Sequence, residues 1–479
     1  MSVFIISTPE SYLPERSYIL DVVIKQWLGF EYKHQIWPQS YSQIRVNDYE
    51  ESALAMPDTF FQTPAKDWLT ERSLPLGPLP LMDLDHYREE IPLTNSDIPI
   101  ISGRDHPEGV FSQYPWQRRQ PYLWNAAQHC YVGIDIFGAA FFMLTRYEEY
   151  VEPDRDQFGR FPASASLACR EGFLERPIIN EYIEVLWWCM KRLWPGLERK
   201  KRTFQTMVSH DVDIPFAYAI TSTGQLIHNL GGDLLKRKSP LMAINRAKSW
   251  VTVKRSAPQQ DPYYNFGRLM DISEQHNLRS AFYFKTGCTN PNYDDKYSIN
   301  HPYLRALLRD IHNRGHEIGL HPSYETYLNP EQTRAEFHRL LKACAEEDIR
   351  QEEWGGRQHF LRWQVPITWR SWAEAGLDYD STLGYADHAG FRCGVCYEFP
   401  VYDLELSQPL DLVERPLIVM EASVLGEQYM NLNEQQALDS IMTRKQMCNM
   451  YKGVFTLLWH NSSFDSPEKW EMYTAIAAP

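Results

Sequence analysis

Apolar and polar positions after residue 203 alternate between strand-like runs and helical spacing. The strand-like runs are TFQTMVS (203–209), RSAFYFK (279–285), HEIGLH (316–321) and GVFTLLW (453–459), and RQHFLR (357–362) is a further candidate strand. Helical spacing lies between them at about 265–276, from Pro302 to Gly315, and from Pro330 onward. This alternation predicts a parallel sheet covered by helices, either doubly wound or closed as a barrel. In both arrangements, functional side chains gather where strands end.

The first 200 residues follow a different pattern. They are rich in proline and aromatic residues, with helical spacing at about 135–150 and 179–193. We therefore expect an irregular α/β domain over residues 1–200 and a second domain over residues 203–479. The basic run Arg199–Arg202 lies between them and is typical of a solvated connector.

Composition and charge narrow the class of function. The chain has 479 residues, of which 43% are apolar and 14% aromatic, so it is a folded protein and not a disordered one. Its net charge of −14 argues against binding nucleic acid or anionic lipid through overall charge. No signal peptide or membrane span is visible, and the eight cysteines are scattered, so we expect a cytoplasmic protein. Nothing in the sequence indicates an oligomeric state.

The first candidate site is Ser209-His-Asp-Val-Asp213, directly after an apolar run. Asp211 and Asp213 are two residues apart, so they point the same way if the strand continues. One carboxylate can then bind a cation while the other takes a proton. The alternative is a polar turn in which an aspartate caps a helix.

A second candidate site ends the run that contains His321. Glu325 follows four residues later, and on a helical turn this spacing places both side chains on one face, which suits a divalent metal. The alternative is a buried, hydrogen-bonded histidine and a solvated glutamate.

Two further residues follow predicted strands or turns. His460 comes after the last apolar run, where a histidine can act as a general acid if its pKa lies near 7. Asp380, in Asp378-Tyr-Asp380-Ser, offers a carboxylate that can orient an imidazole or hold an arginine. The alternatives are a structural histidine and a capped turn.

Taken in order, these motifs resemble the polysaccharide deacetylase family, also called NodB-homology or carbohydrate esterase family 4. The resemblance covers residues 203–479, and Gly315-His-Glu-Ile-Gly-Leu-His321 is its most specific part. The first half resembles an uncharacterised domain that precedes such deacetylase domains in bacterial surface-polysaccharide clusters, notably around 135–149.

The resemblance implies a distorted (β/α) barrel that holds a divalent metal, usually zinc. It assigns Asp211 as the general base and His460 as the general acid, and it assigns Asp213 and His321 as metal ligands. It also implies an arginine that holds the base, for which Arg357 matches best and Arg362 is the alternative. Asp380 matches the carboxylate that tunes the pKa of the general acid.

The chain departs from the family where the pattern His-(Ser/Thr)-x-x-His requires a second histidine, because Glu325 stands there. Glu325 is then the expected third ligand, and the more anionic set makes manganese, cobalt or iron more competitive with zinc. Other outcomes are a third ligand from His359, His388 or His210, or a weakened site without catalysis.

The activity that the resemblance implies is removal of an N-acetyl group from a sugar in surface-polysaccharide biosynthesis. The expected substrate is an N-acetylated sugar, such as a nucleotide-linked or lipid-linked precursor, and no nucleic acid. The alternatives are a metal-dependent amidase acting on a non-sugar amide or a formyl group, and a non-catalytic glycan-binding or assembly protein.

Overall fold

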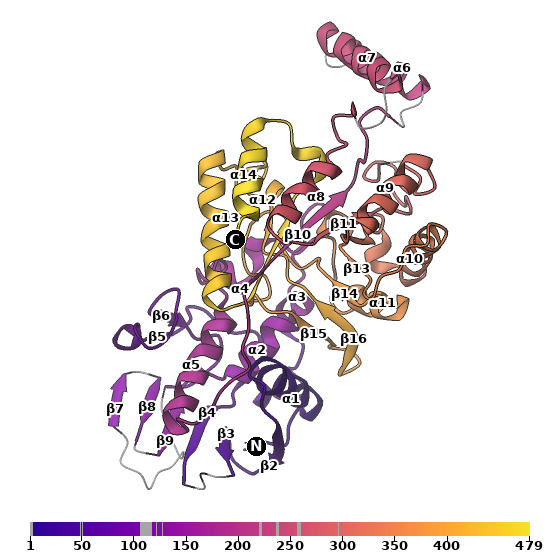
Figure 1. The fold of residues 1–479 in the computed structure, drawn as a ribbon. Helices are drawn as coiled ribbons and strands as arrows, with labels where there is room; N and C mark the ends of the chain where they lie inside the picture. Colours follow the sequence, from indigo (N-terminus) through magenta and orange to yellow (C-terminus); the bar gives the residue numbers. More distant parts are fainter. Residues whose placement is uncertain are drawn as a thin grey trace.

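A computed structural model of the chain contains two large β-sheets, one in each half (Figure 1). It describes residues 3–47, 49, 51–105, 117–120, 122–126, 128–219, 223–235, 239–255, 260–295 and 297–479. Among these residues, no helix combines the length and the apolar character that crossing a bilayer requires.

The sheet of the N-terminal half has seven strands in the order β2-β1-β3-β4-β9-β8-β7 and mixes parallel with antiparallel pairs. Its strands are β1 (Phe4–Thr8), β2 (Tyr32–Ile36), β3 (Tyr41–Val46), β4 (Ala53–Pro57), β7 (Gln117–Gln120), β8 (Leu123–Asn125) and β9 (His129–Val132), while β5 (Leu81–Asp83) pairs with β6 (Asp97–Pro99). The helices are α1 (Leu13–Leu20), α2 (Ile136–Leu144), α3 (Tyr147–Val151), α4 (Leu167–Arg170) and α5 (Ile178–Leu193). The two helices expected from spacing are present, although the first is divided at Arg146, whose φ is 53°.

The sheet of the C-terminal half has nine strands in the order β15-β16-β14-β13-β12-β11-β10-β18-β17. Its strands are β10 (Gln205–Val212), β11 (Ser280–Phe284), β12 (Glu317–Leu320), β13 (Gly355–Gly356), β14 (Tyr379–Asp380), β15 (Phe399–Asp403), β16 (Gln408–Glu414), β17 (Val419–Met420) and β18 (Val454–Leu458). All neighbours are parallel except the edge strand β15, so the expected α/β class with a parallel sheet is confirmed. In the described part of the chain, β15 and β17 are separate edges, and no closed barrel is formed.

Helices connect these strands. They are α8 (Phe266–Gln275), α9 (Pro302–Asn313), α10 (Pro330–Ala345), α11 (Ile367–Ala375), α12 (Glu421–Leu425), α13 (Glu434–Met450) and α14 (Pro467–Ala477). Proline occupies the first turn of α9 and of α10, as the sequence predicts. The candidate strand at 357–362 is wrong: Phe360 and Leu361 have φ of 61° and 54°, and left-handed backbone cannot continue a strand ladder.

The two halves share one buried core. Apolar side chains of both sheets belong to a single continuous cluster. Polar contacts cross the boundary as well, since the Tyr18 hydroxyl donates to the carbonyl of Pro400 at 2.8 Å and the Trp27 indole donates to that of Glu398 at 3.2 Å. By contrast, α6 (Thr223–Leu235) and α7 (Pro240–Arg255) stand apart from the body of the molecule in Figure 1.

Candidate metal centre

Strand β10 brings two carboxylates to the carboxyl end of the C-terminal sheet. Side chains alternate along a strand, so Asp211 and Asp213 share a direction and His210 takes the opposite one. His210 accordingly donates from Nδ1 to the carbonyl of Trp459 at 2.7 Å and stacks on the ring of Phe282. This excludes His210 from the side of the sheet that carries the carboxylates.

His321 follows β12 and is fully buried. Its Nδ1 donates to the carbonyl of Arg357 at 2.7 Å, which places the ring proton on Nδ1. Its Nε2 therefore carries a lone pair, and it lies 3.3 Å from Oδ1 of Asp213.

His359 reaches the same oxygen from the turn after β13. Its Nε2 lies 3.1 Å from Oδ1 of Asp213, and its Nδ1 lies 2.9 Å from Oδ1 of Asp294. A carboxylate on the far nitrogen of a histidine is the usual outer partner of a metal ligand, because it fixes the ring and its proton. The next residue, Phe360, has left-handed backbone, so the turn that presents His359 is strained.

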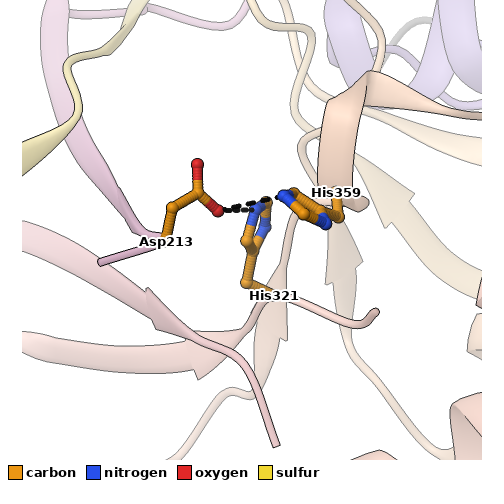
Figure 2. Close-up of side chains that lie close together, drawn as sticks. All are labelled: Asp213, His321 and His359. Atoms are coloured by element: carbon orange, nitrogen blue, oxygen red, sulfur yellow. Dashed lines mark ion pairs between the residues drawn. The ribbon is translucent and has the colours of Figure 1, made fainter. Parts of the chain in front are cut away.

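Three potential metal ligands, one carboxylate and two imidazoles, meet at this point (Figure 2). The ligand atoms of Asp213, His321 and His359 all lie within 4.8 Å of one another. Oδ1 of Asp213 and Nε2 of His321 are buried and have no hydrogen-bond partner. Buried acceptors that face each other are costly unless a cation lies between them, so these residues fit a divalent metal.

The charges around this point agree with that fit. Burial lowers the pKa of His359, but Asp213 and Asp294 raise it above its ordinary value. Burial would raise the pKa of Asp213, yet His359 and His321 hold it well below its ordinary range. The pocket thus keeps Asp213 ionised and favours positive charge beside it.

Glu325, the third ligand expected from the sequence, lies outside this group. Residues 321–325 form an irregular turn and not a helix, so the four-residue spacing does not stack His321 with Glu325. The Glu325 carboxylate instead accepts from Arg362 at 2.9 Å, and the side chain is 47% exposed. His359 stands in the place expected for Glu325, while His388 pairs with Glu175 elsewhere.

Asp211 lies beside the metal group and is held by Arg357. The Arg357 guanidinium donates to Oδ1 of Asp211 at 2.9 Å, and both groups are buried. Two further bonds anchor the guanidinium to Ser381, one to its carbonyl at 2.8 Å and one to its hydroxyl at 3.0 Å. Arg357, and not Arg362, therefore pairs with the expected base.

His460 faces Asp213 from the end of β18. Its Nε2 lies 3.6 Å from Oδ2 of Asp213, and its Nδ1 lies 2.7 Å from Oε1 of Glu421. Burial lowers the pKa of His460, but the Glu421 carboxylate raises it to about 10. The neighbouring carboxylates therefore favour the protonated form of His460.

The carboxylate that accompanies His460 is Glu421 and not Asp380. Asp380 is fully buried on β14, where it accepts from the backbone N–H of Thr382 at 3.0 Å and lies opposite Glu414 of β16. Burial raises the pKa of Asp380. Its sequence position beside a strand end did not reveal which neighbour it faces.

Three residues of the site were missed by the sequence reasoning. Glu421 follows the apolar run LIVM (417–420), a signal as good as the one that identified Asp213. Asp294 lies in a loop with no periodic pattern. Lys285 directly follows β11, and its buried Nζ lies 3.6 Å from Oδ1 of Asp213 and 4.0 Å from Oδ2 of Asp295.

Comparisons with known proteins give two kinds of match. Residues 4–195 match DUF7033, a family of unknown function. Fifteen chains of known structure match, among them a protein from Mycobacterium smegmatis and one from Pseudomonas aeruginosa PAO1, both described as polysaccharide deacetylases. The first is 18% identical with a TM-score of 0.36 and covers 58% of this chain and 83% of its own. The second is 13% identical with a TM-score of 0.35 and covers 65% and 90%.

An allantoinase also matches, at 12% identity and a TM-score of 0.36, over 59% of this chain and 84% of its own. No curated protein matches the chain. Since these TM-scores lie below 0.5, we draw the function from the side chains of the site.

The N-terminal half reaches the metal centre through residues 156–160. Arg160 donates to the carbonyl of Phe360 at 3.2 Å, and Arg362 donates to the carbonyl of Phe158 at 2.8 Å. The rings of Phe158, Tyr293 and Phe360 lie 5.3–5.9 Å apart, and the Phe360 ring is 4.8 Å from that of His359. We call these three rings the aromatic rim.

Proposed function

We propose that this protein is a metal-dependent hydrolase that removes an N-acetyl group from a sugar. The observation that carries the proposal is the convergence of three potential ligand atoms, from Asp213, His321 and His359, on one point, where two of these atoms are buried without a hydrogen-bond partner. A second carboxylate held by an arginine and a histidine held by a carboxylate flank that point. The order of these motifs along the chain, which resembles the polysaccharide deacetylases, supports the same reaction.

The flanking residues supply the proton transfers. A divalent cation held by Asp213, His321 and His359 would polarise the acyl carbonyl and a water molecule. Asp211, held in place by Arg357, would accept a proton from that water as the water oxygen bonds to the carbonyl carbon. The carbon–nitrogen bond then breaks, His460 donates a proton to the leaving nitrogen, and the products are acetate and an amine.

Two neutral imidazoles and one carboxylate form a ligand set that suits zinc with positions left open for reactants. The same ligand set can also bind manganese, cobalt or iron, so these metals stay among the candidates. With His359 and not Glu325 as the third ligand, the ligand set carries less negative charge than the sequence predicted. This lower charge favours zinc.

The aromatic rim supports a sugar as the substrate. Tyr293 is 38% exposed, and its ring lies beside Phe360 at the edge of the metal centre. Flat aromatic rings offer an apolar face to the C–H side of a sugar, while the polar groups of the site bind its hydroxyl and amide groups. In surface-polysaccharide synthesis, the substrate would be a nucleotide-linked or lipid-linked N-acetylated sugar.

Metal content, measured by elemental analysis after dialysis, tests the centre. We expect close to one zinc, manganese, cobalt or iron per chain in the wild type, and less than about a tenth of it in Asp213→Ala and His359→Ala. His388→Gln is the matched control, because His388 pairs with Glu175 away from the centre. Absence of metal after reconstitution with each cation, or full retention in His359→Ala, would overturn the assignment.

Acetate release from a substrate panel tests the reaction. The panel contains free, nucleotide-linked and lipid-linked N-acetylated sugars, an N-formyl sugar and a non-sugar amide. We expect turnover of an acetylated sugar by the metal-loaded wild type only. Faster turnover of the non-sugar amide or of the N-formyl sugar would mean that the enzyme is an amidase or a deformylase and not a sugar deacetylase. Sugar binding without acetate release would mean that the protein is a glycan-binding protein and not an enzyme.

A further inference from the structure

The helical hairpin formed by α6 and α7, residues 223–255, exposes large apolar side chains that no other part of the described chain covers. Each of them is between 39% and 80% exposed: Ile227, Leu234, Leu235, Leu241, Ile244 and Val251. The two helices pack on each other and stand away from both sheets (Figure 1). A group of large exposed apolar side chains of this kind is typical of a docking site.

The exposed side chains follow helical spacing. On α7, Leu241, Ile244 and Val251 are three and seven residues apart, so they lie on one side of the helix. On α6, Ile227 and Leu234 are seven residues apart and also share a side. Among the hairpin side chains that the structure describes, the buried apolar ones are Leu226, Ala243 and Val253, fewer than the six exposed ones.

The charge of the hairpin is opposite to that of the remaining chain. Residues 223–255 contain seven Lys and Arg and one Asp, a net charge of +6. Because the whole chain carries −14, the rest of it carries −20. The overall charge, which argued against anionic partners, therefore conceals a local reversal of sign.

We propose that hairpin 223–255 docks the protein on the surface of an anionic lipid bilayer. Helices that combine exposed apolar side chains with an excess of Lys and Arg bind at the bilayer interface, where apolar side chains enter the acyl boundary and basic groups meet anionic headgroups. A second copy is a poorer occupant, because two facing hairpins would bring like charges of +6 together.

The position of the hairpin links docking to the metal centre. The hairpin is inserted between β10 and α8, so it leaves the sheet at the carboxyl end of β10, where Asp213 also lies. Docking would thus turn the edge that carries the centre toward the membrane. If the proposed function holds, this position favours a lipid-linked sugar over a freely diffusing one. Docking itself does not depend on that function.

Flotation of the full-length protein with lipid vesicles tests docking. The probes are vesicles of phosphatidylcholine alone and vesicles with about a third phosphatidylglycerol. We expect binding to the anionic vesicles that is at least about 10-fold stronger and that weakens as salt is raised. The double variant Leu235→Glu with Leu241→Glu should lower binding at least about 10-fold.

The matched control is Leu76→Glu, because Leu76 is 87% exposed and lies in the N-terminal half. Its binding should equal that of the wild type. Three results would overturn the proposal: no binding to anionic vesicles, equal binding by the double variant, or a wild-type dimer that becomes a monomer in the double variant without any vesicle binding. Acetate release is measured separately, so failure of the deacetylase assignment leaves the vesicle result interpretable.

Discussion

The two halves of the molecule each place a buried aspartate just after a strand, and the two aspartates serve different ends. Asp135 follows β9, and its carboxylate accepts from the backbone N–H groups of Thr59 and Phe60 at 2.8 Å and of Gly138 at 2.9 Å. Asp213 follows β10, and its Oδ1 has no hydrogen bond and faces two imidazole nitrogens. A buried carboxylate surrounded by N–H donors has its hydrogen bonds satisfied and stabilises the fold. A buried carboxylate that faces unpaired nitrogen ligands instead fits a bound cation.

The same contrast holds for buried arginines. At the contact between the halves, Arg146 of the N-terminal half and Arg392 of the C-terminal half both donate to the carboxylate of Glu149. These three groups do not reach the metal centre. In the C-terminal half, Arg357 binds Asp211 directly beside the acceptor cluster. The first arrangement stabilises the contact between the halves, and the second positions a reacting group.

Substitution of Asp211 in the C-terminal half should lower activity, whereas substitution of Asp135 in the N-terminal half should lower stability. We expect Asp211→Asn to lower the rate of acetate release about 10²- to 10⁴-fold with unchanged metal content, because the proton acceptor is lost. Asp135→Asn should lower the free energy of unfolding by about 1–3 kcal/mol, because an amide would face three N–H donors. Activity per folded molecule should then be unchanged. A loss of activity in Asp135→Asn greater than its loss of folded protein would contradict the comparison.

The Glu149 cluster predicts a stability that depends on pH. Burial would raise the pKa of Glu149, but Arg392 and Arg146 lower it to about 2, against an ordinary value of 4.5. A lowered pKa stabilises the fold above about pH 4.5, and this contribution disappears as the pH falls toward 2. Glu149→Gln should therefore cost about 3 kcal/mol at pH 7 and progressively less below pH 4.5. Urea unfolding of the wild type and of Glu149→Gln at several pH values measures this cost. A difference in the free energy of unfolding that does not change with pH would contradict the lowered pKa of Glu149.

Parts of the fold and of the site follow directly from the sequence. Apolar runs that end in polar residues identified β10, β12 and β18, and therefore Asp211, Asp213, His321 and His460. These residues could be found because strand period and strand end are both local signals. The edge strand β15, its neighbour β16 and the hairpin 223–255 were not predicted, because none of them has a counterpart in the strand–helix alternation.

The remaining site residues depend on contacts that a sequence does not record. His359 reaches the centre only because Phe360 adopts left-handed backbone, a conformation that its sequence does not announce. Glu325 fails to reach it because residues 321–325 do not form a helix. The choice between Asp380 and Glu421 as the partner of His460 was decided by which strands lie side by side, which is a property of the sheet order.

The contact between the halves at residues 156–160 predicts intermediate effects. Arg160→Ala should lower kcat about 10-fold without loss of metal, because the bond to the strained turn after His359 is removed. Phe158→Ala should raise KM more than it lowers kcat, because one ring of the aromatic rim is lost. Arg155→Ala is the matched control, since the hydrogen bonds of Arg155 to described residues go to carbonyls within 149–154 and not to the turn after His359. An equal change in Arg155→Ala would assign these effects to loop disorder.

Glu325→Gln should have the smallest effect and still discriminates most clearly between the ligand sets considered. The pair with Arg362 is partly exposed, so its loss should change the free energy of unfolding by less than about 1 kcal/mol. Metal content and acetate release should stay within about twofold of the wild type, because His359 and not Glu325 faces Asp213. Elemental analysis of this variant beside His359→Ala provides the measurement. Loss of metal in Glu325→Gln together with retention in His359→Ala would mean that the turn at 321–325 rearranges to bring the glutamate inward when the cation binds.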